Sequence, residues 1–285
     1  MKHPRGFVLA IDGPAGSGKS TTARLCAERL GFQHLDTGAM YRAVTLKALR
    51  AGTITASPSA IFALLQRTSV TVAWDRRGMR TFLDGKDVSM EIRAPEVSAL
   101  VSEVSAMSTV RRRLVVEQRR VAAGQAVVCE GRDIGSVVFP DADLKIFIEC
   151  DAAERARRRQ FELAGQGVQT AQKVVLANLV KRDRIDSGRE VSPLRRMPDA
   201  VLLDTTHLTI EEQVAVVCDI ARRRCARFKM QNAECEMQDE GRTATTRAKA
   251  KSQTPKAKTD GGGRRMAHCP TGAAEANDER RMAVR

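Results

Sequence analysis

Aromatic side chains are scarce in this sequence: they make up 4% of its 285 residues, with one tryptophan and one tyrosine. The four histidines show no metal-ligand spacing, and the seven cysteines include no C-x-x-C pair. We therefore expect neither a zinc site nor a disulfide framework, and the unpatterned cysteines indicate a reducing compartment. The shortage of aromatic rings also disfavours a protein that stacks on nucleic-acid bases.

Long apolar runs are missing as well. No stretch approaches the ~18 apolar residues that a membrane span needs. The basic segment 1–5 is followed by a run of five apolar residues, 7–11, before Asp12, and this is too short for the core of a signal peptide. We therefore expect a cytoplasmic protein that does not contact a membrane.

Acidic residues are outnumbered. There are 48 Lys and Arg against 34 Asp and Glu, and +10 of the formal net charge of +14 falls within residues 1–228. A basic body predicts anionic partners. Composition alone does not decide between nucleic acid and small phosphates.

Short apolar runs alternate with segments of helical periodicity, which predicts an α/β fold with a central parallel sheet flanked by crossover helices. The expected strands are residues 7–11, 32–35, 126–129, 144–148 and 200–203, and the expected helices are 19–30, 39–50, 97–121, 152–164, 171–184 and 210–227.

Residues 68–92 interrupt this alternation. Short strand-like runs separated by turn signals predict a small antiparallel insert there. We expect one folded domain over residues 1–228, followed by a low-complexity basic tail over residues 229–285. The tail has almost no large apolar side chains, so burial cannot offset the entropy of ordering it, and we expect it to be disordered.

A phosphate-binding loop lies between the first strand and the first helix. The segment GPAGSGKS fits the pattern G-x-x-x-x-G-K-[ST], in which backbone N–H groups surround the phosphates of a nucleotide at a helix N-terminus. Lys19 is expected to reach the β- and γ-phosphates, and Ser20 to ligate Mg²⁺. The sequence thus predicts bound ATP and Mg²⁺ at Gly13, Pro14, Ala15, Gly16, Ser17, Gly18, Lys19, Ser20 and Thr21.

Two groups of polar residues follow strands of the expected sheet, where ligands of open α/β sheets collect. Arg42 lies one turn into the helix after the second strand and could pair with a phosphate through two hydrogen bonds, although a solvated arginine on a capped helix is equally compatible. Arg132 and Asp133 follow the third strand. They offer a cation for phosphate and an acceptor for an amino group, or else a structural ion pair.

Two more groups of charges lie later in the chain. Arg155, Arg158 and Arg159 share one helix face. Such mutually repelling charges favour a polyanionic phosphate, with a solvated basic face or a nucleic-acid patch as alternatives. Glycines near residue 165 suit a mobile lid over residues 152–170. Arg182, Asp186 and Arg189 form either a further part of the site or a structural ion-pair network.

Together the motifs resemble those of the bacterial cytidylate kinase family. The matching segments, which span residues 6 to about 227, are IDGPAGSGKST, HLDTGAMYRA, DVSMEIRAPEVSALVSEVSAMSTVR, EGRDIGSVVFPDADLKIFIECDAAERARRR and RDRIDSGREVSPL. The resemblance implies a P-loop nucleoside-monophosphate kinase with lid helices and a small antiparallel insert in its monophosphate-binding region. It also implies transfer of the γ-phosphate of ATP to CMP or dCMP.

The resemblance further implies a role for each matching residue. Many relatives have serine where this chain has Thr37, which preserves the hydroxyl, and the tail has no counterpart in typical members. The implied sets are Thr37, Arg42 and Arg132 for the acceptor phosphate; Ser102, Arg111 and Asp133 for cytosine; Arg182 and Asp186 for the sugar; Tyr41 and Arg189 as further acceptor contacts; and Lys19, Arg132, Arg155, Arg158 and Arg159 for catalysis, with the arginines of 155–159 over the ATP phosphates.

Two other functions stay open on the sequence. One is a kinase for another small acceptor, such as UMP or AMP. The other is a basic P-loop ATPase that binds nucleic acid through its arginine helix and tail. Such an ATPase needs an acidic residue at the end of a strand, and only the segment VVCEG, which contains Glu130, resembles this arrangement. We expect a monomer whose body, residues 1–228, does not bind nucleic acid, and leave this open for the tail.

Overall fold

The computed structural model describes residues 6–53, 58–165 and 167–228. The expected tail over residues 229–285 lies outside the described residues. Within the part of the chain that is described, no helix is both long and apolar enough to cross a membrane.

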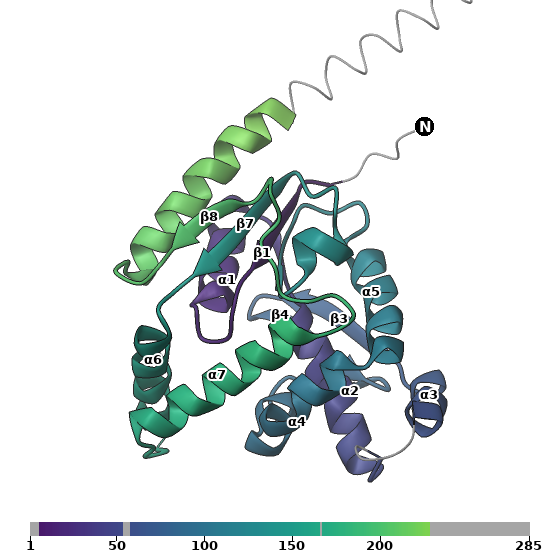
Figure 1. Ribbon diagram of the computed structural model, residues 1–285. Helices are drawn as coiled ribbons and strands as arrows, with labels where there is room; N and C mark the ends of the chain where they lie inside the picture. The colour runs from purple at the N-terminus through teal and green to yellow at the C-terminus, as the bar shows by residue number, and fades with distance from the viewer. Residues whose placement is uncertain (1–5, 54–57, 166, 229–285) are drawn as a thin grey trace, which may run out of the picture. The chain divides into compact units, whose positions relative to one another are not determined.

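A five-stranded sheet, of which Figure 1 labels β1, β7 and β8, lies at the centre of the fold. Its strand order is β2-β6-β1-β7-β8. All neighbouring strands run parallel, as the alternation of apolar runs predicts. The inner strands are almost wholly buried, while the edge strands are partly exposed. The strands are β1 (Val8–Asp12), β2 (Gln33–Asp36), β6 (Val127–Gly131), β7 (Leu144–Glu149) and β8 (Val201–Asp204).

Apolar side chains cover both faces of this sheet. In β1, Val8 and Ala10 belong to one buried cluster, while Leu9 and Ile11 belong to another, because successive side chains of a strand point to opposite faces. Helix α1 and the helix over residues 210–228 cover one face, and α2, α4 and α5 cover the other. The helices are α1 (Lys19–Leu30), α2 (Thr37–Arg50), α3 (Pro58–Gln66), α4 (Pro95–Ala106), α5 (Ser108–Ala122), α6 (Ala152–Gly165) and α7 (Gln172–Gly188).

Three helices differ from the expectation. The single helix expected over residues 97–121 is divided at Met107, whose extended backbone (φ −68°, ψ 121°) separates α4 from α5. Helix α3, whose residues are mostly apolar, was not among the helices expected from the sequence. Helix α7 continues to Gly188, beyond the expected end at residue 184, so Asp186 lies inside it together with Arg182.

The insert is an antiparallel sheet of three strands, as the turn signals predict. It consists of β3 (Val70–Asp75), β4 (Gly78–Leu83) and the short β5 (Lys86–Asp87). Trp74 joins the insert to the central sheet, since its indole Nε1 donates a hydrogen bond to the backbone carbonyl of His34 in β2 (2.6 Å).

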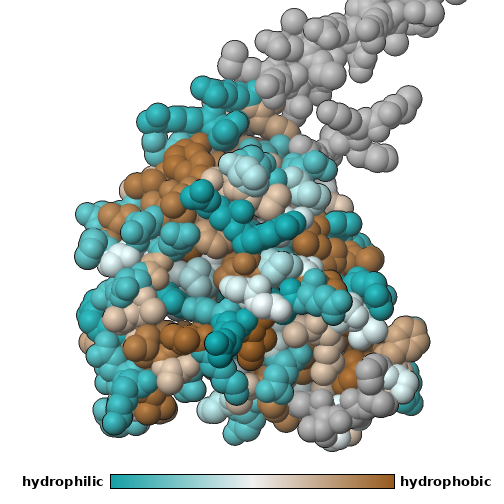
Figure 2. Space-filling model, viewed as in Figure 1, coloured by the Kyte–Doolittle hydropathy of each residue, from teal (hydrophilic) through white to brown (hydrophobic). Residues whose placement is uncertain are grey.

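Exposed apolar residues do not merge into one surface on the face drawn in Figure 2. Brown apolar patches there are separated by teal polar side chains. Met90 and Phe161 are among the large apolar residues that are exposed. Such scattered exposure is usual for globular proteins.

Candidate active site

The phosphate-binding loop joins β1 to α1 and needs its glycines for two reasons. A Cβ on Gly13 would lie 2.4 Å from the carbonyl oxygen of Ile148 in β7, and Gly16 has a φ of +74°. A side chain at position 13 would clash with the backbone of β7, and a side chain at position 16 would strain a left-handed backbone, so each position requires glycine. The loop therefore curls at the N-terminus of α1, where its N–H groups can meet phosphate oxygens.

Lys19 is folded back over this loop. Its Nζ donates to the carbonyl of Pro14 (3.1 Å), and the side chain is buried. Burial, together with the nearby charge of Arg132, lowers the pKa of Lys19 to about 7. An anion bound here would compensate the lysine charge, as the motif predicts.

Ser20 lies against an acidic residue that the sequence did not single out as part of the site. Its Oγ donates to Oε2 of Glu130 (2.5 Å), and Nε2 of His34 is 3.1 Å from Oε1 of the same carboxylate. Burial raises the pKa of Glu130, but the hydrogen bond from His34 and the charge of Lys19 outweigh it, so the pKa lies below its usual range. The signal available in the sequence was the position of Glu130 at the end of an expected strand.

The residues around Ser20 fit a magnesium ion. A hydroxyl and an ionised carboxylate are oxygen ligands of the kind that Mg²⁺ prefers, and Mg²⁺ usually takes its remaining ligands from substrate phosphates and water. The described residues contain no group of three or more His, Cys, Asp or Glu side chains that could hold a metal by themselves.

Asp12, at the end of β1, fixes the loop that follows β6. Its two carboxylate oxygens accept hydrogen bonds from the backbone N–H groups of Ile134 and Gly135, each at 2.8 Å. Burial outweighs these hydrogen bonds and raises the pKa of Asp12 to about 6. The contact holds Arg132 and Asp133, which precede the two N–H groups, close to the phosphate-binding loop.

Replacing Asp12 with asparagine tests this arrangement through its pH dependence. The pKa of Asp12 is about 6 in the folded protein, above the usual value of 3.8. Protonation of Asp12 therefore stabilises the folded protein; this stabilisation is fully present below pH 3.8 and is lost as the pH rises through 6. The asparagine side chain does not titrate. The free energy of unfolding of the native protein relative to Asp12→Asn should therefore fall by about 2–3 kcal/mol between pH 4 and pH 7. Urea denaturation at both pH values measures this, and a constant difference would contradict it.

All ten predicted acceptor residues line one cavity of about 80 Å³ beside the phosphate-binding loop. They come from α2, α4, α5, α7 and the loops that follow β6 and α7. Residues far apart in the chain thus meet where β2 and β6 end. The ten residues are Thr37, Tyr41, Arg42, Ser102, Arg111, Arg132, Asp133, Arg182, Asp186 and Arg189.

One end of the cavity is formed by a buried ion pair. Arg111 and Asp133 are in direct contact, and both are almost fully buried. The guanidinium of Arg111 also lies over the ring of Tyr41, 5.3 Å from its centroid, and donates to the carbonyl of Ser105 (3.1 Å). These contacts hold the Asp133 carboxylate in one orientation, as recognition of a planar ligand requires.

At the other end of the cavity, several arginines surround the carboxylate of Asp186. Asp186 accepts from Nε of Arg132 (2.8 Å) and from Arg189 (3.0 Å). Burial raises the pKa of Asp186, but the two arginines outweigh it and the pKa is lowered. Arg182 is mostly buried, and burial together with the charges of Arg132 and Arg42 lowers its pKa to about 10. Its Nε is a buried donor that has no hydrogen-bond partner among the described residues. A group of arginines that outnumbers its carboxylate partner suits an anionic ligand.

Arg42 and Thr37 are held by the protein rather than solvated. Arg42 donates to Oγ of Ser98 (2.7 Å) and to the carbonyl of Ile92 (3.3 Å). Arg42 is thus partly buried and hydrogen-bonded within the protein, and its pairing with a phosphate stays a prediction. Thr37 donates to the carbonyl of Glu130 (2.7 Å), which links the start of α2 to the end of β6.

The three arginines of α6 do not form a uniform solvent-facing stripe. Arg155 is buried, donates to Asp183 (2.6 Å) and contacts the carbonyl of Ala15 in the phosphate-binding loop (3.0 Å). Arg158 donates to Glu154 and to backbone carbonyls, and Arg159, which is 38% exposed, pairs with Glu162. Their repulsion is thus relieved by acidic neighbours, and a role over ATP phosphates stays a prediction.

Comparison with known proteins agrees with these motifs. A profile of the family described as cytidylate kinase matches residues 9–223. A cytidylate kinase from Geobacter sp. is 46% identical over 221 residues, which cover 78% of this chain and 95% of the relative. Cytidylate kinases from Carboxydothermus hydrogenoformans (47% identity; 76% of this chain, 97% of the relative) and Pelotomaculum thermopropionicum (49%; 73% and 93%) are similar to comparable extents. The chain therefore belongs to the cytidylate kinase family.

Proposed function

We propose that this chain transfers the γ-phosphate of ATP to CMP or dCMP, giving ADP and CDP or dCDP. The observation that carries the proposal is that every residue which the family motifs assign to the acceptor lines the same cavity beside the phosphate-binding loop. Soluble nucleotides as substrates support a cytoplasmic location.

The ATP site consists of backbone N–H groups and the side chain of Lys19. The backbone N–H groups of residues 15–20 surround the ATP phosphates, and Lys19 moves from the Pro14 carbonyl to the β- and γ-phosphates. Ser20, with Glu130 behind it, would hold Mg²⁺, which when bound neutralises charge on the phosphates.

On the acceptor side, Thr37, Arg42 and Arg132 bind the phosphate of CMP. One of its oxygens attacks the γ-phosphorus, and the bond from this phosphorus to the β–γ bridging oxygen breaks as ADP leaves. The attacking oxygen is already anionic, so no strong general base is needed. The protein contributes mainly positioning and stabilisation of the charge on the transferred group, to which the arginines of α6 add.

Selection of the base rests on Asp133. The exocyclic amine of cytosine donates to its carboxylate, which Arg111 orients, and Ser102 lies beside them. Uracil has a carbonyl at this position, so UMP would bury a carboxylate without its donor. Arg182 and Asp186 bind the sugar, and Arg189 contacts the acceptor in the closed site.

A panel of acceptors tests the proposed function. CMP, dCMP, UMP and AMP are compared as acceptors for ATP in one coupled assay, at equal enzyme and Mg²⁺ concentrations. We expect kcat/KM to be highest for the two cytidine nucleotides. Equal values for all four acceptors would refute recognition of cytosine by Asp133, and ATP hydrolysis stimulated by RNA without transfer to any acceptor would refute the kinase.

A further inference from the structure

Three hydrogen bonds connect the insert to the phosphate-binding loop. Trp74 donates from the insert to the backbone carbonyl of His34 in β2 (2.6 Å). The ring of His34 contacts Oε1 of Glu130 (3.1 Å), and Oε2 of Glu130 accepts from Ser20 (2.5 Å). Neither His34 nor Trp74 belongs to the acceptor cavity, so the functions assigned above do not explain this arrangement.

The Glu130 carboxylate is held from both sides. Its side chain is 2% exposed, and each of its oxygens takes part in one of the two side-chain contacts. A buried carboxylate is costly unless donors stabilise it. Because an ionised carboxylate only accepts, Nε2 of His34 must carry the proton in this contact. Without His34, Oε1 would lose its donor and the carboxylate could turn away from Ser20.

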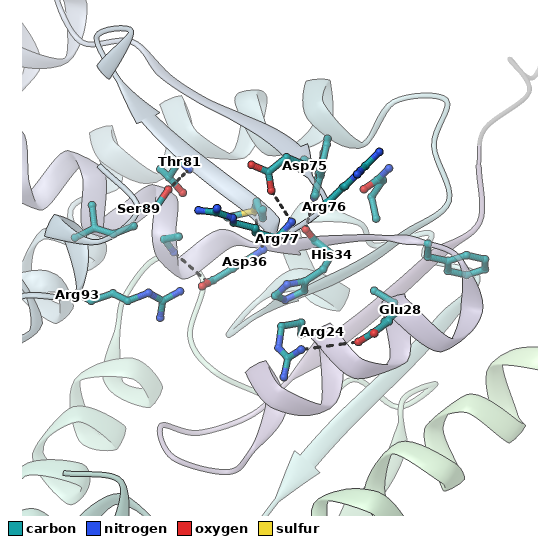
Figure 3. Close-up of a pocket in the computed structure, with 18 residues that line it drawn as sticks. Arg24, Glu28, His34, Asp36, Asp75, Arg76, Arg77, Thr81, Ser89 and Arg93 are labelled. Atoms are coloured by element: carbon teal, nitrogen blue, oxygen red, sulfur yellow. Dashed lines mark hydrogen bonds and ion pairs between the residues drawn. The ribbon is translucent and has the colours of Figure 1, made fainter. Parts of the chain in front are cut away.

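His34 reaches Glu130 from a separate hollow of about 470 Å³ between α1, β2 and the insert. Figure 3 shows its ring between the β3–β4 turn, with Arg76 and Arg77, and helix α1, with Arg24 and Glu28. The side chain is 15% exposed. His34 thus contacts one oxygen of the carboxylate, and Ser20 contacts the other.

We propose that His34 is a positioning residue that orients the Glu130 carboxylate toward Ser20, and so toward the magnesium ion that the proposed function requires there. Trp74 supports it by fixing the main chain of His34 to the insert. Partners that orient the groups around a metal typically contribute a factor of about 10–100 in metal affinity or activity.

Metal binding measured apart from turnover tests this role. Mn²⁺ replaces Mg²⁺, and the free Mn²⁺ signal in electron paramagnetic resonance gives its Kd for the full chain saturated with ADP. We expect His34→Ala to raise this Kd by about tenfold or more. It should also raise the Mg²⁺ concentration that gives half-maximal activity, while KM for CMP changes less than about twofold. His34→Gln should recover most of the affinity, because its amide can place a donor where Nε2 lies.

Arg76→Ala is the matched control, since Arg76 lines the same hollow and touches none of the three hydrogen bonds; its Kd for Mn²⁺ should equal that of the native protein. An unchanged Kd in His34→Ala would overturn the proposal. So would equal losses in His34→Ala and His34→Gln that follow a fall in Tm, because they would show a merely structural role. The Mn²⁺ measurement needs no acceptor, so it separates failure of this proposal from failure of the cytidylate kinase activity.

Discussion

Replacing Arg132 with alanine is expected to lower kcat/KM for phosphorylation of CMP by at least about 10²-fold, the loss typical of one oriented donor to a transition state. Arg132 lies at the end of β6, between the phosphate-binding loop and the acceptor cavity. Its Nε donates to Asp186 (2.8 Å), and its Nη1 donates to the carbonyl of Gly131 (3.3 Å). These contacts aim the guanidinium at the cavity, where Arg132 can bind the acceptor phosphate and the phosphoryl group as it moves.

The fold should tolerate this change. Asp186 keeps its hydrogen bond to Arg189 when Arg132 is removed, so no carboxylate is left buried without a partner. We therefore expect a lower kcat as well as a higher KM, because the charge that Arg132 stabilises develops during phosphoryl transfer. Steady-state kinetics with CMP and ATP varied separately would measure both constants.

Two further variants make the result specific. Arg132→Lys keeps the charge but loses the planar pair of donors, and should recover only part of the activity. Arg113→Ala removes an exposed arginine of α5 that pairs with Glu117 on the surface and should leave kcat/KM unchanged. A near-normal rate for Arg132→Ala would remove Arg132 from the proposed mechanism.

The sheet and the phosphate-binding loop could be predicted because local sequence determines them. Runs buried on both faces, such as Val8–Asp12, are apolar almost throughout, and the glycines of the loop are required by its own backbone. All ten cavity residues could also be identified from the sequence. The position and charge pattern of Arg42, Arg132, Asp133, Arg182, Asp186 and Arg189 already made them candidates, whereas Thr37, Tyr41, Ser102 and Arg111 came from the family motifs. Nothing in the local pattern around Ser102 or Arg111 places these residues beside Asp133.

Contacts that depend on pairing between distant segments were missed. Glu130 meets Ser20, 110 positions away, only because β6 lies next to β1. Asp12 meets the N–H groups of Ile134 and Gly135 for the same reason. Sequence also could not show that Arg155 pairs with Asp183, 28 positions away, so three arginines on one helix face gave the impression of an unpartnered stripe. Side-chain partners of this kind are set by tertiary packing and leave no periodic signal.

Changing Asp133 to asparagine should reduce the preference for CMP over UMP. The carboxylate accepts a hydrogen bond but cannot donate one, whereas an asparagine amide can turn its N–H₂ group toward the carbonyl of uracil. We expect kcat/KM for CMP to fall by about 10²-fold or more, and the ratio of kcat/KM for CMP to that for UMP to fall at least about tenfold.

Asparagine rather than alanine is the informative substitution, because Asp133 is the ion-pair partner of the buried Arg111. Breaking a buried pair by removing one partner typically costs about 3–5 kcal/mol of stability, and the amide oxygen of asparagine can still accept from the guanidinium. Thermal unfolding with and without nucleotide would show whether the variant is folded under assay conditions.

Asp186→Asn is the matched control, since it makes the same chemical change in the same cavity, at the residue proposed to bind the sugar. It should slow the reaction with CMP and UMP alike and leave their ratio unchanged, because both acceptors carry the same ribose. An unchanged ratio in Asp133→Asn, or an equal change in Asp186→Asn, would mean that the base is selected elsewhere in the cavity. A change confined to Asp133→Asn would place selection of the base on the carboxylate that Arg111 orients.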